Sequence, residues 1–203
     1  MPHINVLLRD IKVKPLLEGP WSGVDAGVLG LHNNNFDIMH LYGDFDSVSE
    51  LELEKLQEKL DFEISPAEKD FTDSEIALKA LAEAGYTSID VYGALGGRID
   101  HELINIQLLK NPQLRELNIR LIDDKNIISL LPSGRHNLSK TSLTYVSFVP
   151  FYDETCLTLS GFKYNLTDKY ISIGETLTVS NEFQNDEAFV ETSHDLLMIN
   201  SSD

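Results

Sequence analysis

The pattern of apolar residues changes near residue 115, and this change sets narrow limits on the fold. Before it, short apolar runs alternate with segments in which apolar residues recur at helical spacing. The runs are 4–8, 38–42, 62–64 and 89–92, and the helical patterns are 49–60 and 72–84. Alternating strands and helices predict a parallel sheet covered by helices, so we expect an α/β domain at 1–115.

After residue 115 the chain has almost no helical periodicity. The segment 119–131 predicts a hairpin, because two apolar runs flank the turn-forming residues 123–126. Further short apolar runs, separated by turn residues, lie at 145–151, 156–162, 170–174, 177–181, 188–192 and 196–200. This spacing is typical of an all-β domain, and we expect a β-sandwich at 116–203.

The chain is strongly acidic, with 33 Asp and Glu against 16 Lys and Arg and a net charge of -17. Nucleic acids and anionic membranes bind clustered basic residues, so this balance argues against both as partners. The single Cys156 excludes an internal disulfide framework, and no stretch has the roughly 18 to 20 apolar residues that cross a bilayer. The start of the sequence lacks the layout of a signal peptide. We expect a soluble cytoplasmic protein.

The first candidate motif is GDFDS at 43–47, which follows the apolar run 38–42. Asp44 and Asp46 are two residues apart, so an extended backbone points both carboxylates the same way. Their repulsion needs compensation from solvent, a basic side chain or a divalent cation. Ligands of parallel α/β sheets bind beyond the carboxyl ends of strands, where this loop is expected. The alternative is that Asp46 and Ser47 only make a turn and a helix cap.

The second motif is KDFTDSE at 69–75. Thr72 and Glu75 have the spacing of a capping box, and an acid such as Asp73 is favoured in a first helical turn whatever the function. Asp70 is not needed for capping. Lys69 supplies a cation suited to phosphate.

The third motif is GALGGRIDH at 93–101, which follows the apolar run 89–92 and precedes a helical segment. Three glycines let the backbone approach a ligand closely, and the N-terminus of the next helix favours an anion. Arg98 can hold phosphate with two parallel hydrogen bonds. The alternative is that Asp100 is a helix cap and His101 a surface residue.

Together, the three expected strand ends supply carboxylates, a lysine, an arginine and a glycine-rich loop. Magnesium takes oxygen ligands, and a polyphosphate such as that of ATP needs its charge neutralised before attack. The combination predicts a site for one or more magnesium ions that bridge a polyphosphate.

The motifs GDFDS, KDFTDSE and GGRIDH, in this order and spacing, resemble the thiamine pyrophosphokinase family. The segments SGVDAGVLGL at 22–31 and TVSNEF at 178–183 are also similar to that family. The resemblance implies an α/β nucleotide domain, a C-terminal β-sandwich, magnesium, and a homodimer that binds thiamine between its subunits. The chain departs from the family at Leu8-Arg9-Asp10, where a pair of glycines often follows the first strand.

The resemblance also implies roles for individual residues. The catalytic residues would be Asp44, Asp46, Asp73, Arg98 and Asp100, of which the four aspartates would hold metal. The nucleotide would contact Lys69, Asp70, Thr72, Gly96, Gly97, Arg98 and His101. Thiamine would contact Ser180, Asn181 and Asp73, although Ser and Asn at 180–181 are also ordinary turn residues.

The implied reaction is attack of the thiamine hydroxyl on the β-phosphorus of ATP, which gives thiamine diphosphate and AMP. Metal and Arg98 would stabilise the charge of the transferred group, and no general base is assigned. Two alternatives stay open. One is another magnesium-dependent nucleotide phosphotransferase or phosphohydrolase, and the other is a non-catalytic ligand-binding protein.

Overall fold

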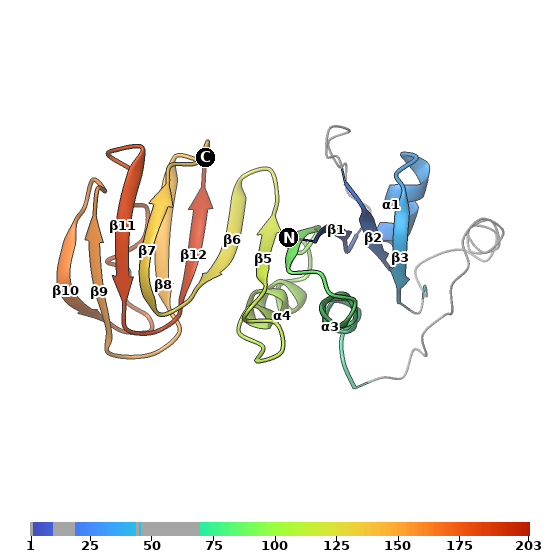
Figure 1. Cartoon of the computed structure of the whole chain (residues 1–203), viewed down its shortest axis with the longest axis horizontal. Helices are drawn as coiled ribbons and strands as arrows, with labels where there is room; N and C mark the ends of the chain where they lie inside the picture. The colour runs from blue at the N-terminus through green and yellow to red at the C-terminus, as the bar shows by residue number, and fades with distance from the viewer. Residues whose placement is uncertain (1, 10–18, 44, 46–69) are drawn as a thin grey trace. The chain divides into compact units, whose positions relative to one another are not determined.

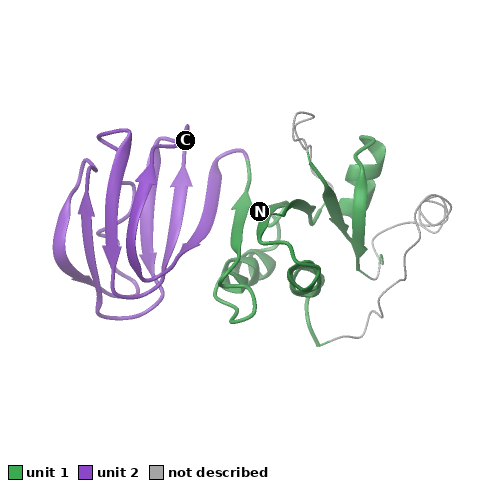
Figure 2. Ribbon diagram, viewed as in Figure 1, with its two compact units in different colours: residues 1–123 green, residues 124–203 purple. Residues whose placement is uncertain are grey.

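The computed structural model of this chain describes residues 2–9, 19–43, 45 and 70–203. The predicted helix at 49–60, the predicted strand at 62–64 and the candidate site residues Asp44, Asp46 and Lys69 lie outside the described residues. The chain divides into two compact units, Met1–Asp123 and Asp124–Asp203 (Figure 2).

Five described strands of the first unit pair with one another in parallel (Figure 1). Its strands are β1 (His3–Leu7), β2 (Trp21–Val24), β3 (Ile38–Tyr42), β4 (Ser88–Tyr92) and β5 (Asn118–Ile122). They lie in the order β3-β2-β1-β4-β5. The parallel α/β architecture predicted for this part of the chain is therefore confirmed.

Three described helices belong to this unit: α1 (Gly27–Asn33), α3 (Asp73–Glu83) and α4 (Ile99–Leu108). Thr72 caps α3, as the predicted capping box requires, because its hydroxyl accepts a hydrogen bond from the Glu75 N–H at 3.3 Å. The buried face of α3 carries Ala77, Leu78 and Leu81. Periodicity and capping therefore gave the position of this helix correctly.

The second unit is made of antiparallel strands, as predicted. They are β6 (Asn126–Leu131), β7 (Gly134–Ser139), β8 (Tyr145–Pro150), β9 (Thr155–Ser160), β10 (Leu166–Ile171), β11 (Glu187–Thr192) and β12 (Leu196–Ser201). They form two groups, β6-β12-β8 and β10-β9-β11-β7. Side chains from both groups, including Phe148, Leu157 and Val190, share one buried core, which is the packing of a β-sandwich.

Three details differ from the sequence-based expectations. Strand β2 was not predicted, and neither was β7, whose residues are mostly exposed and polar. The expected strand at 177–181 is wrong: these residues form a turn and a bend, and only Asn181 makes an isolated bridge, to Val146. The segment still bonds to β8: the Phe148 N–H donates to the Thr178 carbonyl at 3.0 Å, and the Thr178 hydroxyl donates to the Phe148 carbonyl at 2.5 Å.

Candidate active site

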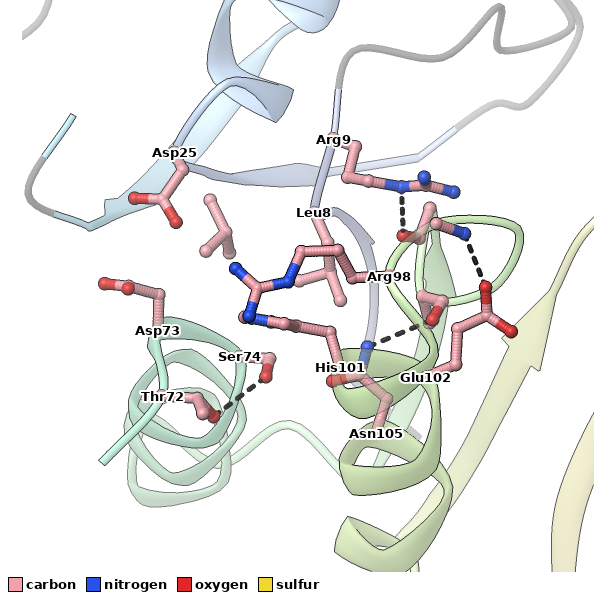
Figure 3. Close-up of a pocket in the computed structure, with 14 residues that line it drawn as sticks. Leu8, Arg9, Asp25, Thr72, Asp73, Ser74, Arg98, His101, Glu102 and Asn105 are labelled. Carbon is pink, nitrogen blue, oxygen red and sulfur yellow. Dashed lines mark hydrogen bonds between the residues drawn. The ribbon is translucent and has the colours of Figure 1, made fainter. Parts of the chain in front are cut away.

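A cavity of about 430 Å³ lies in the first unit, beyond the carboxyl ends of β1 and β4 (Figure 3). Its walls come from loops and helix starts that are far apart in the sequence. The lining residues are Leu8, Arg9, Val24, Asp25, Thr72, Asp73, Ser74, Gly93, Ala94, Gly97, Arg98, His101, Glu102 and Asn105.

The strand order explains why the cavity is here. In the sheet, β2 and β3 lie on one side of β1, and β4 and β5 lie on its other side. The strand order therefore reverses between β1 and β4, and a crevice forms beyond the carboxyl ends of these two strands. In a parallel sheet this crevice is the usual ligand site.

The loop 93–97 forms one wall of the cavity. Gly93 and Gly96 have φ angles of 77° and 78°, which side chains other than glycine rarely adopt. The Arg9 guanidinium donates hydrogen bonds to the carbonyl oxygens of Gly93 at 2.8 Å, of Gly96 at 3.1 Å, and of Leu95. The Gly97 N–H donates to the Glu102 carboxylate at 2.5 Å.

Arg98 reaches into the cavity just before α4 begins. Its Nε and Nη2 donate to the two oxygens of Asp100 at 3.1 and 2.6 Å. This hydrogen-bonded ion pair raises the pKa of Arg98 and lowers the pKa of the Asp100 carboxyl, so both groups are charged at neutral pH. Arg98 occupies the N-cap position, and Asp100 lies in the first turn, so the alternative that Asp100 caps α4 is wrong.

The start of α3 forms the opposite wall, with Thr72, Asp73 and Ser74. Asp73 lies in the first turn and lines the cavity, on the same side as Asp25 in Figure 3. The Glu75 carboxylate pairs with Lys79 at 2.7 Å and accepts from Nδ2 of Asn111 at 3.3 Å, which agrees with the structural role expected for it. The positive end of the α3 dipole faces the same space as Asp73.

Asp25 adds a second carboxylate, from the turn between β2 and α1. Gly43, directly after β3, has a φ of 131°, and a β-carbon there would overlap the Asp25 carboxylate. The glycine of GDFDS is therefore needed both for its backbone conformation and for the close approach of Asp25. Asp25 belongs to the segment 22–31 noted above, but no role was predicted for it.

The cavity brings together five of the predicted site residues. They are Thr72, Asp73, Gly97, Arg98 and His101. Gly96 and Asp100 contact lining residues without lining the cavity, and Asp70 is exposed outside it. Sequence reasoning missed Arg9, Asp25, Ser74, Glu102 and Asn105. Asp25 could have been predicted, because it is an acidic residue between a strand and a helix, as in the other motifs.

Ser180 and Asn181 belong to the second unit. Asn181 is 3% exposed, and its Oδ1 accepts from the N–H groups of Tyr164 at 3.0 Å and Glu182 at 2.9 Å. Its Nδ2 donates to the Tyr164 carbonyl at 2.8 Å. Ser180 is exposed, has a φ of 58°, and donates its backbone N–H to the Ser147 hydroxyl. Asn181 therefore holds the turn together, whereas the Ser180 hydroxyl is accessible.

Within the described part of the chain, no group of three or more His, Cys, Asp or Glu side chains is arranged to hold a metal ion. Two of the four predicted ligands, Asp44 and Asp46, lie outside that part. The described carboxylates that line the cavity, Asp25, Asp73 and Glu102, are the hard oxygen donors that magnesium prefers. Among the described residues, no helix is both long and apolar enough to span a membrane.

Comparison with known proteins agrees with this arrangement. Residues 20–121 match the family described as "Thiamin pyrophosphokinase, catalytic domain", and residues 135–197 match "Thiamin pyrophosphokinase, vitamin B1 binding domain". The chain is 38% identical over 187 residues to thiamine pyrophosphokinase of Bacillus subtilis, covering 90% of this chain and 87% of that protein.

Solved structures give the same result. The chain resembles the crystal structure of the Bacillus subtilis thiamine pyrophosphokinase, with a TM-score of 0.90, 35% identity and 99% of each chain covered. It also resembles a thiamin pyrophosphokinase family protein from Enterococcus faecalis, with a TM-score of 0.89, 30% identity and 100% of each chain covered.

Proposed function

The chain belongs to the thiamin pyrophosphokinase family, and from this membership we propose how its residues perform the family reaction. In that reaction the diphosphoryl group of ATP is transferred to the hydroxyl of thiamine, which gives thiamine diphosphate and AMP. The polyphosphate of ATP binds in the cavity between β1 and β4. The location of this cavity, at the reversal of strand order and lined by residues of the motifs at 69–75 and 93–101, is the observation that carries the proposal.

Arg98 is the residue best placed to stabilise the transferred group. Its guanidinium points into the cavity and is oriented by two hydrogen bonds to Asp100. A fixed cation stabilises charge that develops in the transition state without needing to reorganise. Asp100 thus orients Arg98, besides its predicted role as a metal ligand.

Magnesium would be held by Asp73 together with Asp44, Asp46 and Asp100, as the family resemblance implies. When bound, it would neutralise phosphate charge and polarise the transferred group. Asp73 would also meet the incoming hydroxyl, because it lies at the cavity wall formed by the start of α3. Lys69, Asp70, Thr72, Gly96, Gly97 and His101 remain the proposed nucleotide contacts.

Thiamine is proposed to bind to the β-domain predicted at 116–203. The accessible Ser180 hydroxyl is suited to contact the aminopyrimidine ring, which both donates and accepts hydrogen bonds. The Asn181 amide makes three hydrogen bonds within the turn. Its second N–H is able to donate to a ligand.

We further propose that the active protein is a homodimer, with the thiamine site completed by a second copy. Exposed apolar side chains on α4 support this. Ile99 is 68% exposed and Leu103, one turn later, is 55% exposed, so both lie on one face of the helix. A solvent-exposed apolar stripe beside a ligand cavity favours burial against another subunit. The predicted cytoplasmic location remains a prediction.

The proposed roles are tested by measuring AMP release from ATP with thiamine present and absent. Arg98→Lys should lower turnover at least about a hundredfold, since a point charge cannot replace the guanidinium fork. Asp73→Asn should have an effect of similar size. Arg135→Lys, in the exposed pair with Glu191, is the matched control. Wild-type turnover in a folded Arg98→Lys protein would remove Arg98 from the mechanism, and ADP as product would exclude diphosphoryl transfer.

The shared site has a separate test. A Ser180→Ala protein and an Asp46→Asn protein, each impaired alone, should regain activity when mixed, because one hybrid site then contains both intact halves. Lack of recovery after demonstrated subunit exchange would contradict a site built from two copies.

A further inference from the structure

Arg9 connects the segment after β1 with the loop 93–97 after β4. It follows β1, at the point where the chain lacks the glycine pair common in its family, and its side chain crosses to the loop after β4. We propose that Arg9 is a positioning residue that holds loop 93–97 in the conformation that receives the ATP polyphosphate. This inference rests on the function proposed above.

The contacts are specific to a guanidinium. Arg9 donates from Nε, Nη1 and Nη2 to the carbonyl oxygens of Gly93, Gly96 and Leu95. Three carbonyl oxygens that converge on one point repel one another unless a donor lies between them. A planar group with five N–H donors in fixed directions satisfies all three at once, whereas a lysine ammonium cannot match this geometry.

These bonds also fix the N–H groups of the loop. In a trans peptide unit, the carbonyl of one residue and the N–H of the next residue point in opposite directions. Each carbonyl that points toward Arg9 therefore directs the N–H of the following residue away from Arg9. The peptide between Gly96 and Gly97 is held at both ends, because Gly96 O accepts from Arg9 and Gly97 N–H donates to Glu102. Loop 93–97 is thereby held in one conformation, and a backbone that binds an anion must be preorganised in this way.

The packing of Gly97 supports the same role. A β-carbon at this position would lie 2.5 Å from Nη1 of Arg9 and 3.2 Å from its Cζ. A side chain at 97 would therefore displace the guanidinium from its present position. The close approach of Arg9 is thus one reason for the second glycine of the GGRIDH motif, besides any close approach of a ligand.

The test compares Arg9→Met and Arg9→Lys with the wild type. Amide hydrogen exchange across 93–98 should be faster in both variants, since both lose the fork. The KM for ATP should rise about tenfold or more and kcat should fall, because a shift of about 1 Å in a positioning group can cost a hundredfold in rate. The KM for thiamine should change little. Arg135→Met, which removes an exposed arginine paired with Glu191 in the other unit, is the control.

Three outcomes would overturn the proposal. Wild-type kinetics in Arg9→Lys would show that charge alone is needed. Weaker ATP binding with unchanged exchange at 93–98 would show that Arg9 contacts the nucleotide instead of positioning the loop. Unchanged ATP kinetics in folded Arg9→Met would show that the loop needs no support. If the wild type itself releases no AMP with thiamine, the proposed function fails, while hydrogen exchange still decides whether Arg9 holds the loop.

Discussion

Replacement of Asn181 by alanine separates a structural role of this residue from a substrate contact. The amide is 3% exposed and makes three hydrogen bonds, two to the backbone of Tyr164 and one to the N–H of Glu182. These bonds join the turn before β11 to the segment before β10. Asn181→Ala should therefore destabilise the second unit even when no substrate is present.

The expected size follows from the bonds that are lost. Each hydrogen bond contributes about 1 kcal/mol net, and a buried group left without a partner costs about 1–3 kcal/mol. Tyr164 is partly exposed, so water can replace some of the lost bonding. We expect a loss of about 3 kcal/mol in the free energy of unfolding, which corresponds to a decrease in Tm of roughly 10 °C.

The assay is thermal unfolding followed by circular dichroism, combined with measurement of the KM for thiamine. Ser180→Gly is the matched control, because glycine accepts the φ of 58° and the substitution removes the side chain with its hydroxyl. This control should keep or raise the Tm while the KM for thiamine rises. A wild-type Tm in Asn181→Ala, with only the KM for thiamine changed, would refute the structural role of the amide.

Three further predictions concern the first unit. Arg120→Met should lower the free energy of unfolding, measured with urea, by about 2 kcal/mol. The loss is smaller than for a fully buried ion pair, because the Asp90 side chain is 7% exposed but that of Arg120 is 41% exposed. Gly27→Ala should cost about 3 kcal/mol or more, or prevent folding, since a β-carbon would overlap the Leu7 carbonyl; an unchanged Tm would contradict this. Burial, with a smaller contribution from Asp90, raises the pKa of Tyr92, so the folded state binds this proton more tightly than the unfolded state. Stability should therefore decrease as the pH rises above about 10, and less steeply in Tyr92→Phe, as thermal melts can show.

The elements that could be predicted from the sequence are those whose signals are local. Helix α3 has a capping box and a periodic apolar face within the same segment, so its position follows from neighbouring residues. Strand β2 has only four residues, Trp-Ser-Gly-Val, and is a strand because β1 and β3 pair with it on both sides. This strand is therefore determined by tertiary contacts and not by its own sequence pattern. Strand β7 pairs along β11 through its backbone, which a polar sequence does not reveal.

The same distinction applies to the candidate site. Asp73, Arg98 and His101 could be predicted because each lies in a short motif between an expected strand and a helix. Arg9 could not, because its partner Gly93 is 84 positions away and the two meet only when β1 pairs with β4. Local spacing contains no information about which strands are neighbours. Arg9 was noted only as a departure from the glycine pair expected there.

The two arginines of the cavity differ in how their charges are balanced. Arg98 forms its fork with the carboxylate of Asp100, so an approaching phosphate must compete with an existing ion pair for the same N–H groups. The three partners of Arg9 are neutral carbonyl oxygens, which orient the guanidinium without cancelling its charge. In a chain of net charge -17, a positive charge that is held in place by neutral groups attracts a polyphosphate more effectively than one already paired. On the function proposed above, Arg9 is therefore expected to add long-range attraction to its positioning of loop 93–97, and Arg98 is expected to act on the transferred group once it has left Asp100.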